Sequence, residues 1–164
     1  MEHRVMVTSE LTEDTAAVEE LLERVIPAAL AAERVDVPCL VEVLLTDDGG
    51  IHQINLDQRG VDAPTDVLSF PMFDLRPGQH PTPADADPGS GGMVMLGDMV
   101  IDLDRAKAQG EEFGHGTVRE VAYLAVHSVL HLLGYDHLDE GPMKAQMRAR
   151  EEAILSGLGI SRDT

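Results

Sequence analysis

The feature that most constrains the fold is the apolar run VAYLAVHSVLHLL at residues 121–133, in which two histidines interrupt a series of hydrophobic side chains. The segment TVRE at 117–120 precedes it and matches a capping box, which marks the start of a helix. Gly134 follows it, and glycine is typical of the position after the last helical turn. These signals predict a helix that begins near Thr117 and ends at Gly134.

The other elements follow from hydrophobic periodicity and from turn residues. Strands are predicted at 4–8, 39–47, 65–70 and 94–102, and helices at about 13–33, 49–58, 103–112 and from 142 to just before 157. Thr12 is placed to begin the first helix and Pro27 to kink or break it. Strands and helices alternate only partly, which favours α+β, or α/β with a small sheet. We therefore expect a single α+β domain over residues 1–164, with a small mixed four-stranded sheet flanked by about five helices.

The segment between the third and fourth predicted strands, about 72–92, is dense in proline, glycine and aspartate. Such a composition does not form a packed element, so we expect a long flexible loop. It is either a surface insertion without function or a flap over the substrate.

Composition limits the function classes. Thirty acidic residues against twelve lysines and arginines give a net charge of -18, whereas a nucleic-acid binder usually carries a basic face. The global charge therefore argues against RNA chemistry unless a specific motif outweighs it. Cys39 is the only cysteine, which excludes an internal disulfide and a thiolate-rich zinc cage. Without an apolar run of about 18–20 residues or an apolar N-terminal segment, we expect a cytoplasmic protein.

A metal site is predicted from three closely spaced histidines. His127 and His131 are four residues apart on the predicted helix, which puts both imidazoles on one face, about 6 Å apart along the axis. Gly134 lets the chain turn back, so that His137 can approach the same point. Three imidazole ligands leave a fourth position for water or substrate, as in catalytic zinc sites, and nitrogen donors suit Zn²⁺, Ni²⁺ or Cu²⁺ better than magnesium. The remaining histidines are interpreted as bystanders: His3, His52, His80 and His115.

The spacing of these histidines is also that of metzincin proteases. In that class a glutamate follows the first histidine and serves as general base for the attacking water. Ser128 occupies that position here, and a serine cannot do that work at neutral pH. A metzincin-like metallopeptidase therefore remains only as an alternative that lacks its base.

Three blocks of sequence carry a resemblance to a known family. They are LDQRGVDAPTDVLSFP at 56–71, LGDMVI at 96–101 and HSVLHLLGYDH at 127–137. Taken together, they resemble the YbeY family of bacterial ribosomal RNA maturation factors, and the resemblance extends from about residue 40 to residue 155. It implies a metal-dependent, single-strand-selective endoribonuclease that acts in 16S rRNA 3′-end maturation and in ribosome quality control. The metal ligands of the family fall on His127, His131 and His137.

The resemblance also implies two catalytic residues, Arg59 and His127. A guanidinium group matches phosphate bidentately and neutralises charge that develops in the transition state. Without the resemblance, a surface ion pair of Arg59 with Asp57 or Asp62 is the simpler interpretation. Three aspartates near the motifs are candidates for orienting an imidazole, or for purely structural hydrogen bonds: Asp66, Asp98 and Asp136.

By the same resemblance, the partners are single-stranded RNA, the 16S rRNA precursor, the small ribosomal subunit, the GTPase Era and a small-subunit ribosomal protein. Neither DNA nor a membrane is expected. Three phenylalanines, two tyrosines and no tryptophan offer few platforms on which bases can stack, so we expect weak intrinsic RNA binding that partners reinforce. The second alternative is therefore a non-catalytic ribosome-assembly factor whose metal is structural.

Overall fold

The sheet combines three parallel strands with one antiparallel edge strand, in the order β1-β2-β4-β3. The computed structural model describes residues 2–135 and 142–160. In this part of the chain the strands are β1 Arg4–Ser9, β2 Cys39–Thr46, β3 Val67–Pro71 and β4 Val94–Asp102. All four predicted strands are confirmed, and the sheet is mixed as expected.

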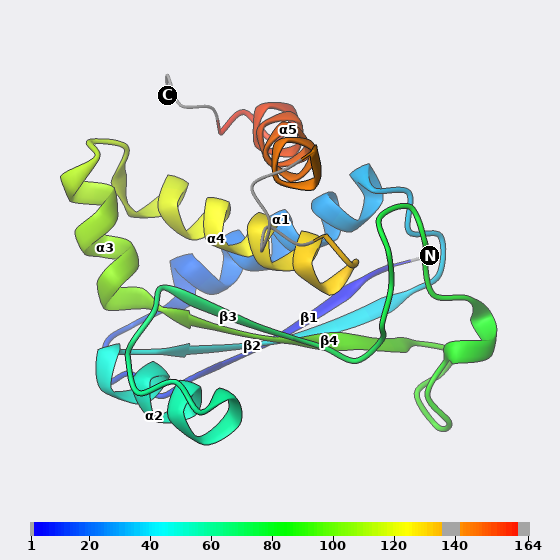
Figure 1. Ribbon diagram of the computed structural model, residues 1–164, viewed down its shortest axis with the longest axis horizontal. Helices are drawn as coiled ribbons and strands as arrows, with labels where there is room; N and C mark the ends of the chain where they lie inside the picture. The colour runs from blue at the N-terminus through cyan, green and yellow to red at the C-terminus, as the bar shows by residue number, and fades with distance from the viewer. Residues whose placement is uncertain (1, 136–141, 161–164) are drawn as a thin grey trace.

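Helices cover the two faces of this sheet unequally (Figure 1). Within the described residues the α-helices are α1 Ala16–Ala32, α2 Asp48–Arg59, α3 Leu103–Glu112, α4 Gly116–Leu132 and α5 Pro142–Gly157, with a short 3-10 helix at Pro83–Asp85. α1 and α4 pack on one face, α5 lies over α4 on the side away from the sheet, and α2 lies on the opposite face. The predicted single α+β domain is therefore confirmed. No helix in residues 2–135 or 142–160 is long and apolar enough to cross a bilayer.

The main hydrophobic core lies between the sheet and the α1–α4 layer. Cys39, Val41, Val43 and Leu45 alternate along β2 with side chains that point the other way, as expected for a strand with two different faces. α4 is buried on most sides because its apolar side chains meet the sheet, α1 and α5. This packing fixes the helix that carries the two central histidines.

Gly97 allows three elements to meet at one point. The register between β2 and β4 shifts at Leu40 and Val41, next to this glycine. A Cβ atom at Gly97 would lie 2.7 Å from the carbonyl oxygen of Phe70 in β3 and 2.8 Å from Cδ2 of Leu132 in α4. Because glycine has no side chain, β3 can lie close to both β4 and the C-terminal end of α4.

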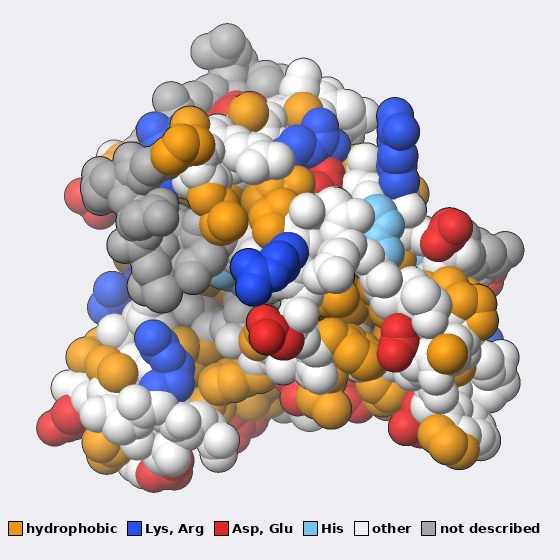
Figure 2. Space-filling view, turned by 45° about the vertical axis from the view of Figure 1, so that its right-hand side comes forward, with side chains coloured by type: hydrophobic (Ala, Val, Ile, Leu, Met, Phe, Trp, Pro, Cys, Tyr) orange, Lys and Arg blue, Asp and Glu red, His pale blue; other side chains and the backbone are white. Residues whose placement is uncertain are grey.

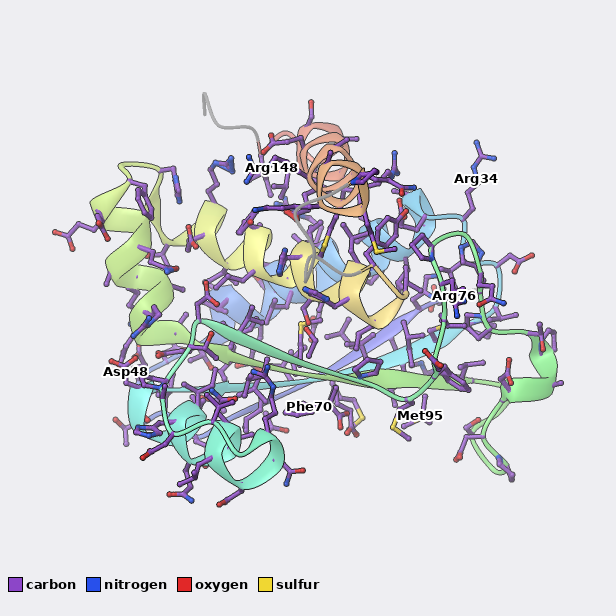
Figure 3. All side chains as sticks on the ribbon, in the orientation of Figure 1. Arg34, Asp48, Phe70, Arg76, Met95 and Arg148 are labelled. Atoms are coloured by element: carbon purple, nitrogen blue, oxygen red, sulfur yellow. The ribbon has the colours of Figure 1, made fainter. Side chains whose placement is uncertain are left out.

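The opposite face of the sheet is covered only in part. Ile51 of α2 packs against Leu68 and Val100 in a small separate core. Phe70 lies on the same side of the sheet (Figure 3) and borders an open pocket of about 580 Å³. α2, which ends at Arg59, lies on the other side of the sheet from α4.

The predicted capping box at Thr117–Glu120 is wrong, because the N-cap of α4 lies two residues before Thr117. The helix begins at Gly116, and His115 is its N-cap. His115 Nε2 lies 2.7 Å from the carboxylate of Glu120, so this glutamate binds the imidazole and does not close a box with Thr117. A histidine that the sequence pattern leaves as a bystander therefore has a buried carboxylate as its partner.

The predicted start and break of α1 are also wrong. Its N-cap is Thr15, not Thr12, and the helix runs unbroken past Pro27. A proline in a helix removes one backbone hydrogen bond. Here Ile26 and Leu30, on either side of the proline, are fully buried in the core, and this packing holds the helix together.

Candidate metal centre

His127 and His131 lie one turn apart on α4, and their imidazole rings converge. Their Nε2 atoms are 3.2 Å apart, and the ring centroids are separated by 4.7 Å with the planes at 79°. Both residues are half-buried, because the surrounding helix packs against the sheet and α5. The structure thus brings two of the three predicted metal ligands to one point.

The spacing of these nitrogens fits a single metal ion. Zinc–imidazole bonds of about 2.0–2.1 Å at a tetrahedral angle place two ligand nitrogens about 3.3–3.4 Å apart, close to the 3.2 Å observed. Among the described residues, no group of three or more His, Cys, Asp or Glu side chains has metal-binding geometry. The third predicted ligand, His137, lies outside the described residues, as does Asp136. The two imidazoles therefore fit a metal as a pair of its ligands.

Glu151 of α5 binds His127 from the side opposite to the second imidazole. Its Oε1 lies 3.0 Å from Nδ1 of His127, and the residue is only 4% exposed. A buried carboxylate in this position keeps a proton on Nδ1 and leaves the Nε2 lone pair available to a ligand. Sequence reasoning missed this residue. The available signal was its position on the buried stripe of α5 with Met147 and Ile154, where a charged side chain needs a partner.

Ser128 faces β3 and is fully buried. Its hydroxyl oxygen lies 2.6 Å from that of Ser69, so the pair ties α4 to the edge strand. The hydroxyl is engaged in this contact and offers no general base to the centre. The position that a metallopeptidase would use for catalysis is therefore structural here.

A pocket of about 270 Å³ opens beside His131 at the end of α4. Its walls include Ser69 of β3 and Phe73 at the start of the 72–92 loop. Gly134 has φ +100°, and a Cβ atom there would lie 2.2 Å from the carbonyl oxygen of Leu75. Glycine thus lets the loop lie against the helix end. The start of the loop borders the candidate site, and its role as a substrate flap stays a prediction.

Glu33 anchors the chain that leaves α4. Tyr135 donates its hydroxyl hydrogen to Oε1 of Glu33 at 2.9 Å, and Arg150 donates from Nε to Oε2 at 2.6 Å. Burial, together with the hydrogen bond to Glu33, raises the pKa of Tyr135 to about 12. The hydroxyl therefore remains a donor at neutral pH and links the end of α4 to α1 and α5.

Arg59 is exposed in the last turn of α2. Its Nη1 donates to Oδ1 of the buried Asn55 at 3.1 Å, whereas Asp57 and Asp62 bind other side chains. The surface ion pair considered for Arg59 is therefore not formed in the described part of the chain. The hydrogen bond of Arg59 in the described part of the chain is therefore internal to α2, and its role together with His127 stays a prediction.

Asp66 and Asp98 contact neither histidine within the described residues. Asp98 lies on the open face of the sheet near Glu42, where partial burial and the charge of Asp98 raise the pKa of Glu42. The backbone carbonyl of Asp66 accepts a hydrogen bond from the amide of Asp102 at 2.9 Å. Asp98 therefore lies on the open face of the sheet, away from α4. Asp66 precedes β3, and its charge helps to raise the pKa of Tyr123, whose ring stacks on His127, so an orienting role for Asp66 stays a prediction.

Basic side chains are dispersed over the surface. On the face in Figure 2, Lys and Arg side chains lie in separate places, with hydrophobic, acidic and other polar atoms between them. This distribution agrees with the net charge of -18. Among the described residues on this face there is no continuous basic track, so contact with RNA would rest on a few individual cations.

Comparisons with known proteins extend over most of the chain. The family model described as Endoribonuclease YbeY matches residues 6–159. The Endoribonuclease YbeY of Roseiflexus castenholzii is 45% identical, covering 97% of this chain and 96% of that protein. The one from Moorella thermoacetica is 50% identical over 86% of each. The solution structure of TM1509 from Thermotoga maritima has a TM-score of 0.56 at 21% identity, covers 94% of this chain and 91% of that chain, and supports the fold alone.

Proposed function

Because the chain belongs to the YbeY endoribonuclease family, we propose that it is a metal-dependent endoribonuclease that cuts single-stranded RNA. The observation that carries this proposal is the pair of histidine Nε2 atoms 3.2 Å apart on a buried helix. A buried glutamate orients one of them, and a pocket opens beside the other. Donors that converge next to an open pocket favour a reactive centre over a closed structural one.

In this proposal His127, His131 and His137 hold one Zn²⁺ ion, or another transition metal such as Ni²⁺. When bound, the metal supplies a Lewis acid for a phosphoryl oxygen and lowers the pKa of a coordinated water. Glu151 keeps His127 in the tautomer that a metal ligand needs and fixes its ring plane. Ser128, whose hydroxyl is engaged by β3, offers no base, which disfavours peptide hydrolysis.

Arg59 is the second proposed catalytic residue, in contact with a phosphate of the RNA strand. Its side chain is exposed and donates one hydrogen bond, to Asn55. The donors of a guanidinium group form a planar fork that matches a phosphate. Since α2 and α4 lie on opposite faces of the sheet, an RNA strand that reached both would pass the edge strand β3.

The proposed biological role is 3′-end maturation of 16S rRNA and ribosome quality control in the cytoplasm. The names of the relatives, which are endoribonucleases, support RNA as the substrate. The dispersed basic side chains and the net charge of -18 support a need for partners that position the RNA. We propose the small ribosomal subunit, the GTPase Era and a small-subunit ribosomal protein for that purpose.

The test is cleavage of a fluorescent single-stranded RNA by the purified protein, before and after metal removal with a chelator and re-addition of Zn²⁺. We expect cleavage to require the metal and to spare a duplex of the same sequence. Arg59→Ala should slow cleavage while the metal content stays the same. Arg34→Ala, which removes another exposed arginine beyond the end of α1, is the matched control and should leave cleavage unchanged. Equal cleavage by metal-free and intact protein, or metal-dependent turnover of casein in place of RNA, would contradict the proposal.

A further inference from the structure

A second pocket, of about 460 Å³, lies at the N-terminal end of α4, between the α3–α4 turn and α5. Its volume is within the range of about 300–1,000 Å³ typical of small-molecule sites. Glu151 and Tyr123 line it, and both also contact His127, the first by a hydrogen bond and the second by ring stacking at 5.8 Å. The pocket is therefore the immediate neighbour of the candidate metal centre.

Arg119 lines this pocket, and the Nε of its guanidinium group is buried without a hydrogen-bond partner. The residue is 6% exposed, its Nε has no hydrogen-bond partner, and no carboxylate in the described part of the chain forms an ion pair with it. Arginine stays charged at any ordinary pH. A buried charge without a partner is costly, so this side chain indicates an anion that enters the pocket from outside.

The neighbouring carboxylates do not pair with Arg119. Glu120 follows Arg119 directly in sequence, but it binds Nε2 of His115 at 2.7 Å. Glu151 binds His127. The pocket also lies at the N-terminal end of a helix of 17 residues, where the helix dipole favours negative charge. The positive charge of Arg119 and the helix end act in the same direction.

Aromatic rings border the same pocket. Phe113 is 64% exposed and stacks on His115 with ring centroids 6.0 Å apart, and Tyr123 adds a half-buried ring. Arg148 reaches the pocket from α5 and lies above α4 in Figure 3. An exposed ring beside two guanidinium groups suits a ligand that has both a planar base and a phosphate.

We propose that this pocket binds one unpaired nucleotide of the RNA substrate, with its phosphate at Arg119 and Arg148 and its base against Phe113. The inference rests on the proposed function, since it needs an RNA strand at the neighbouring metal centre. Three glutamates also line the pocket, namely Glu120, Glu151 and Glu152. They disfavour a bare inorganic anion, whereas the amino and hydroxyl groups of a nucleotide can donate hydrogen bonds to them.

The experiment compares three probes by calorimetric titration of the full chain: AMP, adenosine and inorganic phosphate. We expect AMP to bind more tightly than either of the other two. Arg119→Met should weaken AMP binding about ten- to hundredfold, as expected for loss of charged hydrogen bonds. The same variant should raise the KM for single-stranded RNA by a similar factor and leave kcat within about twofold, because the metal centre is intact.

Two further variants separate this role from a structural one. Arg34→Met makes the same substitution at an exposed arginine on the other side of α5 (Figure 3) and should change none of these values. Arg119→Met should raise the Tm of the ligand-free protein by about 2–4 °C, because an unpaired buried charge is removed. Arg148→Gln alters an exposed side chain, so it should fold normally and weaken AMP binding several-fold.

The outcomes distinguish this inference from the proposed function. Equal AMP binding by the wild type and Arg119→Met, or phosphate binding as tight as AMP binding, overturns the nucleotide pocket. Loss of AMP binding with an unchanged KM for RNA shows a site for free nucleotides and overturns the RNA assignment. If the wild type cuts no RNA, the proposed function fails, whereas the AMP titration still decides whether the pocket binds nucleotides.

Discussion

At each end of α4, a histidine binds a buried glutamate. His115 and Glu120 are 2.7 Å apart at the N-terminal end, and His127 and Glu151 are 3.0 Å apart toward the C-terminal end. The surroundings of the two pairs differ. A second imidazole converges on the C-terminal pair with its Nε2 3.2 Å away, whereas an arginine without a carboxylate partner lies beside the N-terminal pair.

This difference shows that a histidine–glutamate pair does not by itself define a site. The charge of the neighbouring groups decides which ligand can enter. The helix dipole acts in the same sense, with its negative end toward the proposed metal site and its positive end toward the proposed phosphate site. A single buried helix can therefore hold a metal near one end and a phosphate near the other.

The largest difference is expected between the two histidines of these pairs. His127→Ala removes a proposed metal ligand, so kcat for RNA should fall at least about a thousandfold, a loss of about 4 kcal/mol of transition-state stabilisation. His115→Ala leaves the metal ligands in place but frees Glu120, which can then pair with Arg119. This variant should raise KM and leave kcat nearly unchanged. Steady-state kinetics on both variants measure this, and equal losses of kcat would refute the contrast.

The next largest difference is expected between alanine substitutions at the two glycines that flank α4, Gly134 and Gly114. Gly134→Ala would place Cβ 2.2 Å from the Leu75 carbonyl oxygen at φ +100°, and we expect a loss of about 2–4 kcal/mol in the free energy of unfolding. Gly114 also has positive φ, but nothing lies within 4 Å of a Cβ there, so Gly114→Ala should cost only about 1 kcal/mol. Urea denaturation measures the free energy of unfolding of both variants. Similar losses would show that the 72–92 loop does not hold the histidine end of the helix.

Glu151→Gln should weaken metal affinity about ten- to hundredfold, the usual range for loss of a carboxylate that orients a metal-bound histidine. Glu120→Gln is the matched variant at the other end and should leave metal affinity unchanged. Competition with a coloured chelator measures both affinities. Unchanged affinity in Glu151→Gln would mean that the hydrogen bond to Nδ1 of His127 does not support a ligand.

The smallest expected effect is a change in stability at Asp102, a buried carboxylate at the end of β4 that belongs to neither site on α4. Burial, reinforced by the nearby Asp48, raises its pKa from 3.8 to about 7. The folded state therefore binds more protons than the unfolded state between these values, and stability falls as pH rises from about 4 to about 7. Asp102→Asn still accepts the hydrogen bond from the Arg105 amide, so it should raise the Tm by a few degrees at pH 8 and not at pH 4. A gain of the same size at both pH values would contradict the assignment.

The elements and the histidine pair could be predicted from the sequence because local patterns determine them. Hydrophobic alternation locates the strands, and a four-residue spacing on an amphipathic helix places His127 and His131 side by side. The third ligand, His137, stays a prediction because it lies outside the described residues.

The other features of the candidate site depend on contacts between residues that are far apart in the sequence. Glu151 meets His127 only because α5 crosses α4, and the spacing along either helix does not reveal that crossing. The same holds for Arg119, which lay inside a supposed capping box whose glutamate in fact binds His115. The position of Arg59 is a related case, since no local pattern states on which face of the sheet α2 will pack.

The most direct test of the central claim is the metal content of the purified protein, measured by mass spectrometry. The account predicts close to one transition-metal ion per chain in the wild type and in His115→Ala, and almost none in His131→Ala. Equal metal content in all three proteins, or a wild type that takes up no metal from excess Zn²⁺, would contradict it.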